Sequence, residues 1–181
     1  MPHVNLVDQA SAPEASRATL RQIAAAFGTV PNMFKAVANS PAALASMWGA
    51  FGALGKGRIG AKLGETIAVA IADRNRCDYC LAAHTVLGQK AGATAAEMAE
   101  AQLGRAADPK TAAALAFALK VVENRAAVGA ADVEALRAAG FDDEAVVEIM
   151  AHVALNLFTN YVNVAFAVPV DFPVVALSRA A

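Results

Sequence analysis

The stretch between Glu148 and Asp171 constrains the fold most, because no residue inside it carries a formal charge. A stretch of this length can cross a lipid bilayer as a helix. Polar side chains nevertheless recur within it at the spacing of one helix face, and these are His152, Asn156, Asn160 and Asn163. Lipid would leave this polar stripe without hydrogen-bond partners. The stretch is therefore predicted to be a buried helix rather than a membrane span, with its amides paired to neighbouring polar groups.

Helix boundaries are well marked elsewhere, and signals for strands are nearly absent. Four segments carry the capping residues of a helix start: Ser11 to Glu14, Ser40-Pro41, Thr94 to Glu97 and Asp108-Pro109. The first helix is predicted to end near 27, and the last is predicted to be a long one from about 142 to 166. The helices between them are predicted at 32–39, at 41–54, from 61 to a break at 75–76, from 77 or 78 to 90, and at 94–103, 108–125 and 131–139. The pattern predicts an all-α, single helical domain over 1–181. Its core, at about 40–170, contains both cysteines of the chain, and an N-terminal helical extension covers 1–39.

Composition limits the partners that the chain can have. Of its 181 residues, 57% are hydrophobic and 17% are charged, which favours burial of surface in a homo-oligomer, although abundant alanine explains part of this excess. The net charge is -1 and the basic residues are scattered, so no nucleic-acid partner is expected. Met1 to Ala12 has no basic segment followed by an apolar core, so a cytoplasmic location is expected.

The two cysteines of the chain provide the strongest functional signal. Cys77 and Cys80 lie three residues apart, with His84 four residues further on and Glu65 twelve residues upstream of Cys77. A thiol pair at this spacing can close a disulfide, and the histidine and glutamate can move the protons that thiolate chemistry needs. On a continuous helix both cysteines and the histidine share one face, and Glu65 reaches them if the preceding helix folds back.

Positive charge near the thiols is expected to favour the thiolate, which is the reactive form. Arg74 and Arg76 precede the pair in the sequence, and the N-terminus of a helix carries a partial positive charge. Such a thiolate could attack a peroxide oxygen or a disulfide of a partner.

Three interpretations of this motif remain open. The pair could be redox-active, the cysteines with His84 and Glu65 could bind zinc, or the cysteines could be inert core residues beside a hydrogen-bonded histidine. The redox pair is favoured, because structural zinc ligands usually form two separated clusters and because all four residues occur together in a helical chain. His152 is interpreted as a core or interface histidine, with a catalytic role as the alternative.

At this point the chain resembles the carboxymuconolactone decarboxylase superfamily, specifically its alkylhydroperoxidase D-like branch. The resemblance rests on Glu65, Cys77-Asp-Tyr-Cys80 and His84, and it extends more loosely through Ala91-Gly92 and Asn156 to Asn163. It implies an all-helical fold that assembles as trimers or hexamers. It also implies thiol-dependent reduction of hydroperoxides without haem, flavin or metal, so no cofactor is expected.

The resemblance also implies the roles of the motif residues. Cys80 is the expected peroxidatic cysteine, Cys77 the resolving one, and Glu65 and His84 the proton relay. An external dithiol, of the lipoyl type or another small dithiol, is the implied reductant. Where well-understood relatives carry a second histidine, this chain has Tyr79, whose phenol cannot act as a base near neutral pH. Activity could therefore be lower or the reductant different, and the alternative is a redox-sensing or non-catalytic protein of the same fold.

Overall fold

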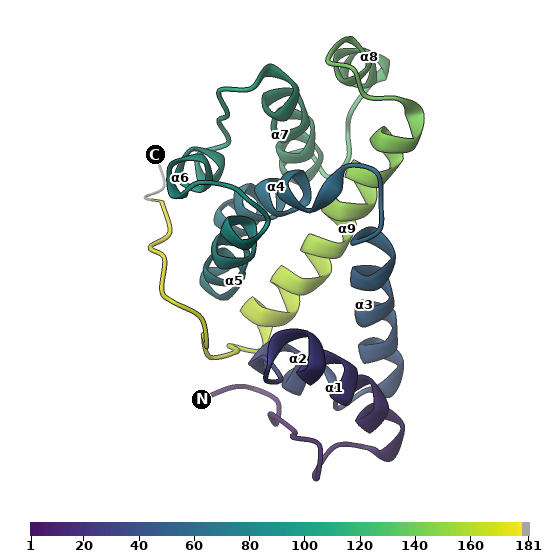
Figure 1. Cartoon of the computed structure of the whole chain (residues 1–181), viewed down its shortest axis with the longest axis vertical. Helices are drawn as coiled ribbons and strands as arrows, with labels where there is room; N and C mark the ends of the chain where they lie inside the picture. Colours follow the sequence, from purple (N-terminus) through teal and green to yellow (C-terminus); the bar gives the residue numbers. More distant parts are fainter. Residues whose placement is uncertain (179–181) are drawn as a thin grey trace.

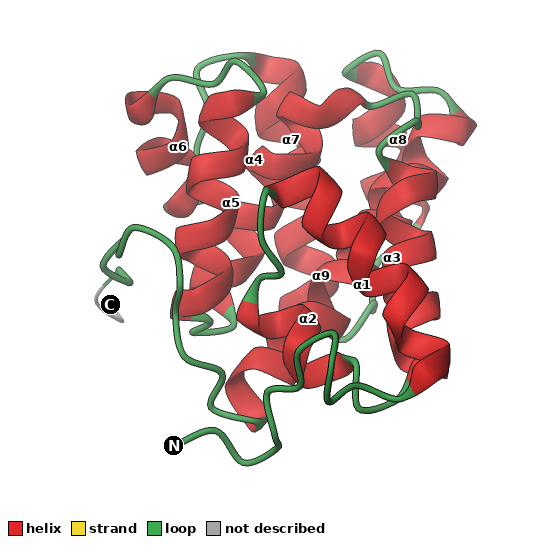
Figure 2. Ribbon diagram, turned by 60° about the horizontal axis from the view of Figure 1, so that its bottom comes forward, coloured by secondary structure: helices red, strands yellow, loops and turns green. Residues whose placement is uncertain are grey.

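The computed structural model describes residues 1–178, and within that range it contains nine α-helices and no strand (Figures 1 and 2). The helices are α1 (Glu14–Phe27), α2 (Asn32–Val37), α3 (Pro41–Leu54), α4 (Gly60–Arg74), α5 (Asp78–Lys90), α6 (Ala95–Gln102), α7 (Pro109–Glu123), α8 (Ala130–Ala138) and α9 (Asp143–Ala165). They form one domain, so the all-α prediction is confirmed, and each predicted helix is present with its ends within a few residues of the expected ones.

The uncharged stretch forms the greater part of α9, the longest helix in the described part of the chain. Figure 1 shows α9 running through the middle of the molecule, and it packs against α3, α4, α5 and α7. Among residues 1–178, α9 alone combines the length and the apolar composition that a membrane span needs. Its buried residues include four polar ones: Asn156, Thr159, Asn160 and Asn163. A helix that buries its amides inside a bundle is a core helix of a soluble fold, as the polar stripe predicts.

Most helix starts follow from their capping residues. The side chains of Ser40, Asp108 and Asp142 accept hydrogen bonds from backbone N–H groups in the first turns of α3, α7 and α9. At α6, Thr94 and Glu97 form the reciprocal bonds of a capping box. These side chains satisfy N–H groups that would otherwise lack partners at the helix ends.

The capping box expected at Ser11 is wrong, although α1 begins where predicted. Pro13 occupies the N-cap position, and no side chain caps the helix. Asp8 explains the difference, because its carboxylate accepts hydrogen bonds from the backbone N–H and the hydroxyl of Ser11. The serine hydroxyl therefore closes a turn before the helix instead of capping it.

The break between α4 and α5 positions the motif. Arg76 has a φ of 58°, in the left-handed region that ends helices, and Cys77 then occupies the N-cap of α5. The expected break at 75–76 and a helix that begins at Cys77 or Asp78 are thus confirmed, with Cys77 as the N-cap and Cys80 and His84 inside α5. The chain folds back at this break, because the side chain of Glu65 from α4 meets that of His84 from α5.

The two terminal parts of the chain pack against the outside of the bundle. In the N-terminal part, Phe27 and Phe34 pack against Trp48 and Phe51 of α3, with ring centroids about 6 Å apart. The C-terminal segment after α9 is not helical, and Figure 1 shows it passing α5 toward α6. Gln102 of α6 donates a hydrogen bond to the carbonyl of Ala176, which fixes this segment.

Candidate active site

Cys77 and Cys80 are joined by a disulfide, with their Cα atoms 5.3 Å apart. Both are buried, with exposed fractions of 0% and 2%. The sulfur of Cys77 also accepts a hydrogen bond of 3.2 Å from the backbone N–H of Cys80, as its N-cap position requires. Because this donor belongs to the first turn of α5, the helix N-terminus stabilises negative charge on the Cys77 sulfur.

Glu65 and His84 form the second part of the site. Nδ1 of His84 lies 2.7 Å from Oε2 of Glu65, and both side chains are largely shielded from solvent, with exposed fractions of 10% and 23%. The carboxylate orients the ring and leaves its other nitrogen, Nε2, available for proton exchange. The fold therefore brings together two residues that lie nineteen positions apart in the sequence.

A narrow cavity of about 30 Å³, hereafter the aromatic cavity, lies beside the disulfide and the glutamate–histidine couple. Cys80 and His84 both line it, whereas Cys77 does not. The rest of its wall is almost wholly apolar and includes the aromatic residues Phe27, Phe34, Phe51, Tyr79 and Phe172. The volume suits one or two groups the size of water. Cys80 is therefore the sulfur that a small reactant meets first, with the histidine beside it.

Asn163 of α9 is a contact of the site that the sequence reasoning did not assign a function. Its Nδ2 donates a hydrogen bond of 3.2 Å to the Cys80 sulfur, and its side chain is buried. The sequence did place Asn163 in the polar stripe, but the stripe was interpreted only as the polar face of a buried helix. An amide donor aimed at sulfur stabilises a thiolate, since hydrogen bonds to a charged form favour it.

The polar stripe as a whole runs along the α4–α5 hairpin. Asn160, one turn before Asn163, accepts a hydrogen bond from the side chain of Asn75, at the break between the two helices. Near the other end, Glu148 accepts from the backbone N–H groups of Arg58 and Ile59, just before α4. Helix α9 thus contacts both ends of α4. The prediction that the amides of the stripe find polar partners is confirmed only in part. Asn160 and Asn163 each pair one amide atom, whereas Oδ1 of Asn156, Nδ2 of Asn160 and Oδ1 of Asn163 are buried without a partner among residues 1–178.

Tyr79 lies between the cysteines and has a structural environment. Its hydroxyl accepts a hydrogen bond from the backbone N–H of Met33, and its ring packs edge-on against Phe172 at 5.7 Å. Burial raises the pKa of the Tyr79 phenol well above its usual value, more than the neighbouring hydrogen bonds lower it. The phenol therefore stays neutral, and it ties the N-terminal part and the C-terminal segment to α5.

The arginines expected to activate the thiols have other partners. Arg74 forms an ion pair of 2.8 Å with Glu123, and Arg76 donates to the backbone carbonyl of Ser178. No hydrogen bond joins either arginine to a sulfur among residues 1–178, so the expected effect of their charge on the thiols stays a prediction. The donors that contact the sulfurs are the backbone N–H of Cys80 and the amide of Asn163.

The zinc interpretation does not fit the arrangement of the side chains. The two sulfurs are joined in a disulfide, and His84 is hydrogen-bonded to Glu65. Within residues 1–178, no three histidine, cysteine or acidic side chains converge in a geometry that could hold a metal ion.

A helical bundle around a buried Cys-x-x-Cys disulfide, with a glutamate–histidine couple beside one sulfur, defines an all-helical thiol–disulfide protein. Residues 41–124 match the sequence model of the carboxymuconolactone decarboxylase family. Together with the structural matches below, this match supports the resemblance to that family and to its alkylhydroperoxidase D-like branch. A search of curated protein sequences found no significant match.

Several solved structures share the fold over nearly the whole chain. A peroxidase-related protein from Silicibacter sp. TM1040 is 25% identical, with a TM-score of 0.81, covering 93% of this chain and 91% of the other. An alkylhydroperoxidase AhpD core protein, peroxidase-related and from Ralstonia eutropha JMP134, is 28% identical, with a TM-score of 0.80 and coverage of 94% and 92%. A debrominase in complex with 2,3,4-tribromopyrrole is 21% identical, with a TM-score of 0.79 and coverage of 93% and 91%. The shared fold therefore occurs in proteins with different names and chemistries.

Proposed function

We propose that this protein is an enzyme that reduces organic hydroperoxides with its Cys77–Cys80 pair, using Glu65 and His84 to move protons. The observation that carries the proposal is the place of Cys80, which is bonded to Cys77 and shares an apolar cavity with His84. The cavity of about 30 Å³ has room for the two peroxide oxygens beside Cys80 and His84, and its apolar wall favours an organic hydroperoxide over a charged reactant.

The peroxide half of the cycle starts from the reduced pair. The Cys80 thiolate attacks the terminal oxygen of the hydroperoxide, the O–O bond breaks, and Cys80 becomes a sulfenic acid. The alkoxide that leaves takes a proton from the His84–Glu65 couple and departs as an alcohol. Cys77 then attacks the Cys80 sulfur as a thiolate, the S–O bond breaks, and hydroxide leaves with a proton as water. The products are one disulfide, one alcohol and one water.

An external dithiol restores the pair in the second half. Its thiolate attacks the Cys80 sulfur, because Cys80 and not Cys77 lines the cavity. The S–S bond breaks, and Cys77 leaves as a thiolate that accepts a hydrogen bond from the backbone N–H of Cys80. A stabilised leaving thiolate speeds this exchange. The second thiol of the donor then releases Cys80, and the donor departs as a disulfide.

Assembly into a homo-oligomer, as trimers or hexamers, belongs to the same proposal. The outer face of α9 exposes four large apolar side chains: Val147, Phe158, Tyr161 and Val164. The helix buries its amides together with Ile149, Val153 and Leu155, yet it still exposes large apolar side chains on its outer face. An outer apolar face of this kind is typical of an interface between copies. A cytoplasmic location also stays a proposal, based on a buried thiol pair that must be reduced in each cycle.

Stopped-flow oxidation of the reduced protein by tert-butyl hydroperoxide tests the proposal. We expect thiol loss much faster than that of free cysteine, no reaction in Cys80→Ser, and a sulfenic acid that accumulates in Cys77→Ser. Turnover is then measured with a panel of dithiols, including dihydrolipoamide, and a bromopyrrole is offered as a competing substrate. Thiol loss no faster than that of free cysteine would sink the peroxidase proposal and favour a redox-sensing role. Faster reaction with the bromopyrrole would favour reductive dehalogenation instead.

A further inference from the structure

His84 lines a second cavity, which has no assigned role. This cavity has a volume of about 120 Å³ and lies between α3, α4 and α9. Its wall includes exposed Gly55, Gly60 and Ala61 at one end and buried Ala68 at the other. Glu65 also lines it, so it extends from the surface to the glutamate–histidine couple. The volume is sufficient for several water molecules, whereas the aromatic cavity at Cys80 is far narrower.

His152 of α9 occupies the wall of this second cavity. Its Nε2 atom is buried and has no hydrogen-bond partner among residues 1–178. Buried polar atoms normally have a partner, and Oδ1 of Asn156, on the same wall, also lacks one. The two side chains therefore offer polar atoms to water inside the cavity. The ring fits there because residue 64 is glycine: a Cβ at Gly64 would lie 2.8 Å from Cε1 of His152.

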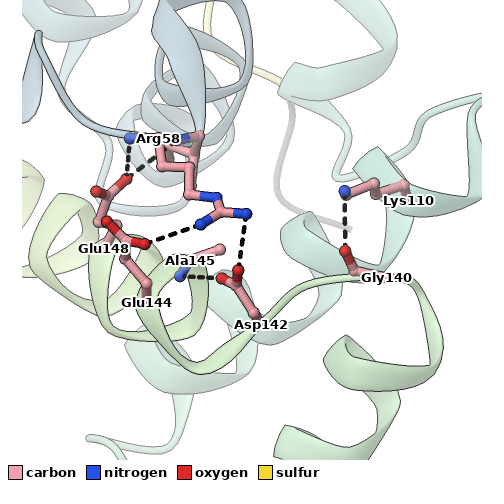
Figure 3. Close-up of polar contacts among 8 residues, drawn as sticks. Arg58, Lys110, Gly140, Asp142, Glu144, Ala145 and Glu148 are labelled. Atoms are coloured by element: carbon pink, nitrogen blue, oxygen red, sulfur yellow. Dashed lines mark hydrogen bonds and ion pairs between the residues drawn. The ribbon is translucent and has the colours of Figure 1, made fainter.

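The rim of the cavity is held in place by α9 itself. Glu148, one turn before His152, accepts hydrogen bonds of 2.6 and 3.0 Å from the backbone N–H groups of Arg58 and Ile59 (Figure 3). The guanidinium of Arg58 forms ion pairs of 3.0 Å with Asp142 and with Glu144. These contacts fix the segment between Gly55 and Gly60, so the opening beside His152 is a built feature of the fold.

We propose that this second cavity is the proton-exchange route of the site and that His152 passes protons along it, between solvent and the Glu65–His84 couple. The inference rests on the proposed function, because the route serves the thiol cycle. Reactants and protons would then use different cavities. Reactants reach Cys80 through the aromatic cavity, and protons reach His84 through the second cavity, which Glu65 and His152 also line. His152 acts through Glu65 and His84, so it is a positioning residue for the relay.

The proton balance of the cycle gives the route its task. If Cys80 rests as a thiolate, its proton has already left, and the alkoxide formed from the hydroperoxide needs one from the relay. His84 gives that proton to the alkoxide, and the couple must then be recharged from solvent. During disulfide reduction, the thiolate released at Cys77 takes up a proton, and this proton leaves again when Cys77 attacks the Cys80 sulfenic acid as a thiolate. The aromatic cavity is lined mainly by apolar side chains, and its polar groups besides Cys80 and His84 are those of Tyr79, Thr159 and Asn163, none of which is a titratable acid or base near neutral pH.

The charged and titratable groups around His152 suit such a role. Burial lowers the pKa of His152 below its ordinary value, and nearby His84 does so too, while the carboxylates of Glu65 and Glu148 oppose the shift. Glu65 and His84 face it from α4 and α5, and Glu148 precedes it on α9. The ring is therefore neutral near neutral pH, and a neutral imidazole accepts a proton at one nitrogen while donating from the other.

The test compares His152→Gln and His152→Ala with wild type, and with His3→Gln as a control that removes an exposed histidine far along the chain. Turnover of tert-butyl hydroperoxide is measured across a pH series, with and without added imidazole. We expect both variants at position 152 to lose about 10-fold in kcat with little change in KM, a modest share of what acid–base groups contribute. Imidazole should restore His152→Ala, whose cavity it can enter, but not His152→Gln. His3→Gln should match wild type.

The outcomes separate this inference from the proposed function. Unchanged kcat in both variants, with active wild type, overturns the proton route and leaves the peroxidase proposal intact. A loss that imidazole does not restore indicates a structural role and also overturns the route. If wild type itself does not consume hydroperoxide, the titration of His152 followed by NMR in wild type and Glu65→Gln decides the coupling. Removing the carboxylate should lower the pKa of His152 further, and no change would overturn the inference.

Discussion

Asn163 of α9 donates a hydrogen bond from Nδ2 to the sulfur of Cys80 over 3.2 Å, although 83 residues separate the two in the sequence. The bond links the polar stripe of α9 to the sulfur that faces the aromatic cavity. It gives Cys80 a donor that does not depend on a nearby positive charge. The N–H of Cys80 serves the Cys77 sulfur in the same way, so each sulfur has its own stabilising donor.

Asn163→Ala is expected to slow oxidation of reduced Cys80 about 10-fold or more. A hydrogen bond to a charged group contributes about 1.5–3 kcal/mol, and each 1.4 kcal/mol corresponds to about tenfold in rate or population. Asn163→Asp should react more slowly still, because a carboxylate beside the sulfur repels a thiolate. The measurement is stopped-flow thiol loss with tert-butyl hydroperoxide, together with the ultraviolet absorbance of the thiolate.

The matched control for this pair is Asn39→Ala. Asn39 is exposed and donates only to backbone carbonyls in the N-terminal part, so its loss should leave the rate unchanged. Equal rates in wild type and Asn163→Ala would contradict a role for the amide.

Glu65→Gln is expected to lower the rate of hydroperoxide reduction about 100-fold, at the lower end of what acid–base groups contribute. The amide preserves the shape of the side chain and can still accept from Nδ1 of His84, but it carries no charge to stabilise the protonated ring. Glu123→Gln is the control, since this carboxylate pairs with Arg74 at the surface. A Glu65→Gln protein that turns over like wild type would remove the couple from the mechanism.

His152 should make the stability of the protein depend on pH. Its folded pKa is lowered below the ordinary 6.5 by burial, so the unfolded chain takes up a proton at a higher pH than the folded one. As pH falls through about 6.5, the unfolded state binds more protons and the free energy of unfolding decreases. Urea midpoints measured over this range should fall more steeply for wild type than for His152→Gln. Parallel curves would show that the ring is not held neutral.

The outer face of α9 should support assembly. Light scattering of the wild-type protein is expected to give a mass several times that of the 18.5 kDa chain. Phe158→Asp combined with Tyr161→Asp should reduce it to that of a monomer, because two buried charges would be left unpaired at an interface. Val174→Ser, which removes a still more exposed apolar residue from the C-terminal segment, is the control. A monomeric wild type would refute the oligomer proposal.

The sequence predicted the helices well, because their signals are local. Capping residues and glycines act over one turn, so Ser40, Thr94 and Asp108 could be recognised without knowledge of their neighbours. The capping box predicted at Ser11 is wrong because a second local interaction competes with it. The carboxylate of Asp8, three residues before Ser11, binds both the hydroxyl and the backbone N–H of the serine. The motif pairing of Cys77 with Cys80 was equally local, because three residues separate the sulfurs.

The sequence by itself determined an all-helical chain, the positions of its helices, the disulfide-capable pair, and a long uncharged helix with one polar face. Only the tertiary structure decided what that face contacts. It places Asn163 at the Cys80 sulfur and His152 at the second cavity. It also pairs Arg74 with Glu123 and Arg76 with the carbonyl of Ser178. Helical spacing fixes which side chains share a face, but the partner of a face depends on how separate helices pack, and no local pattern contains that information.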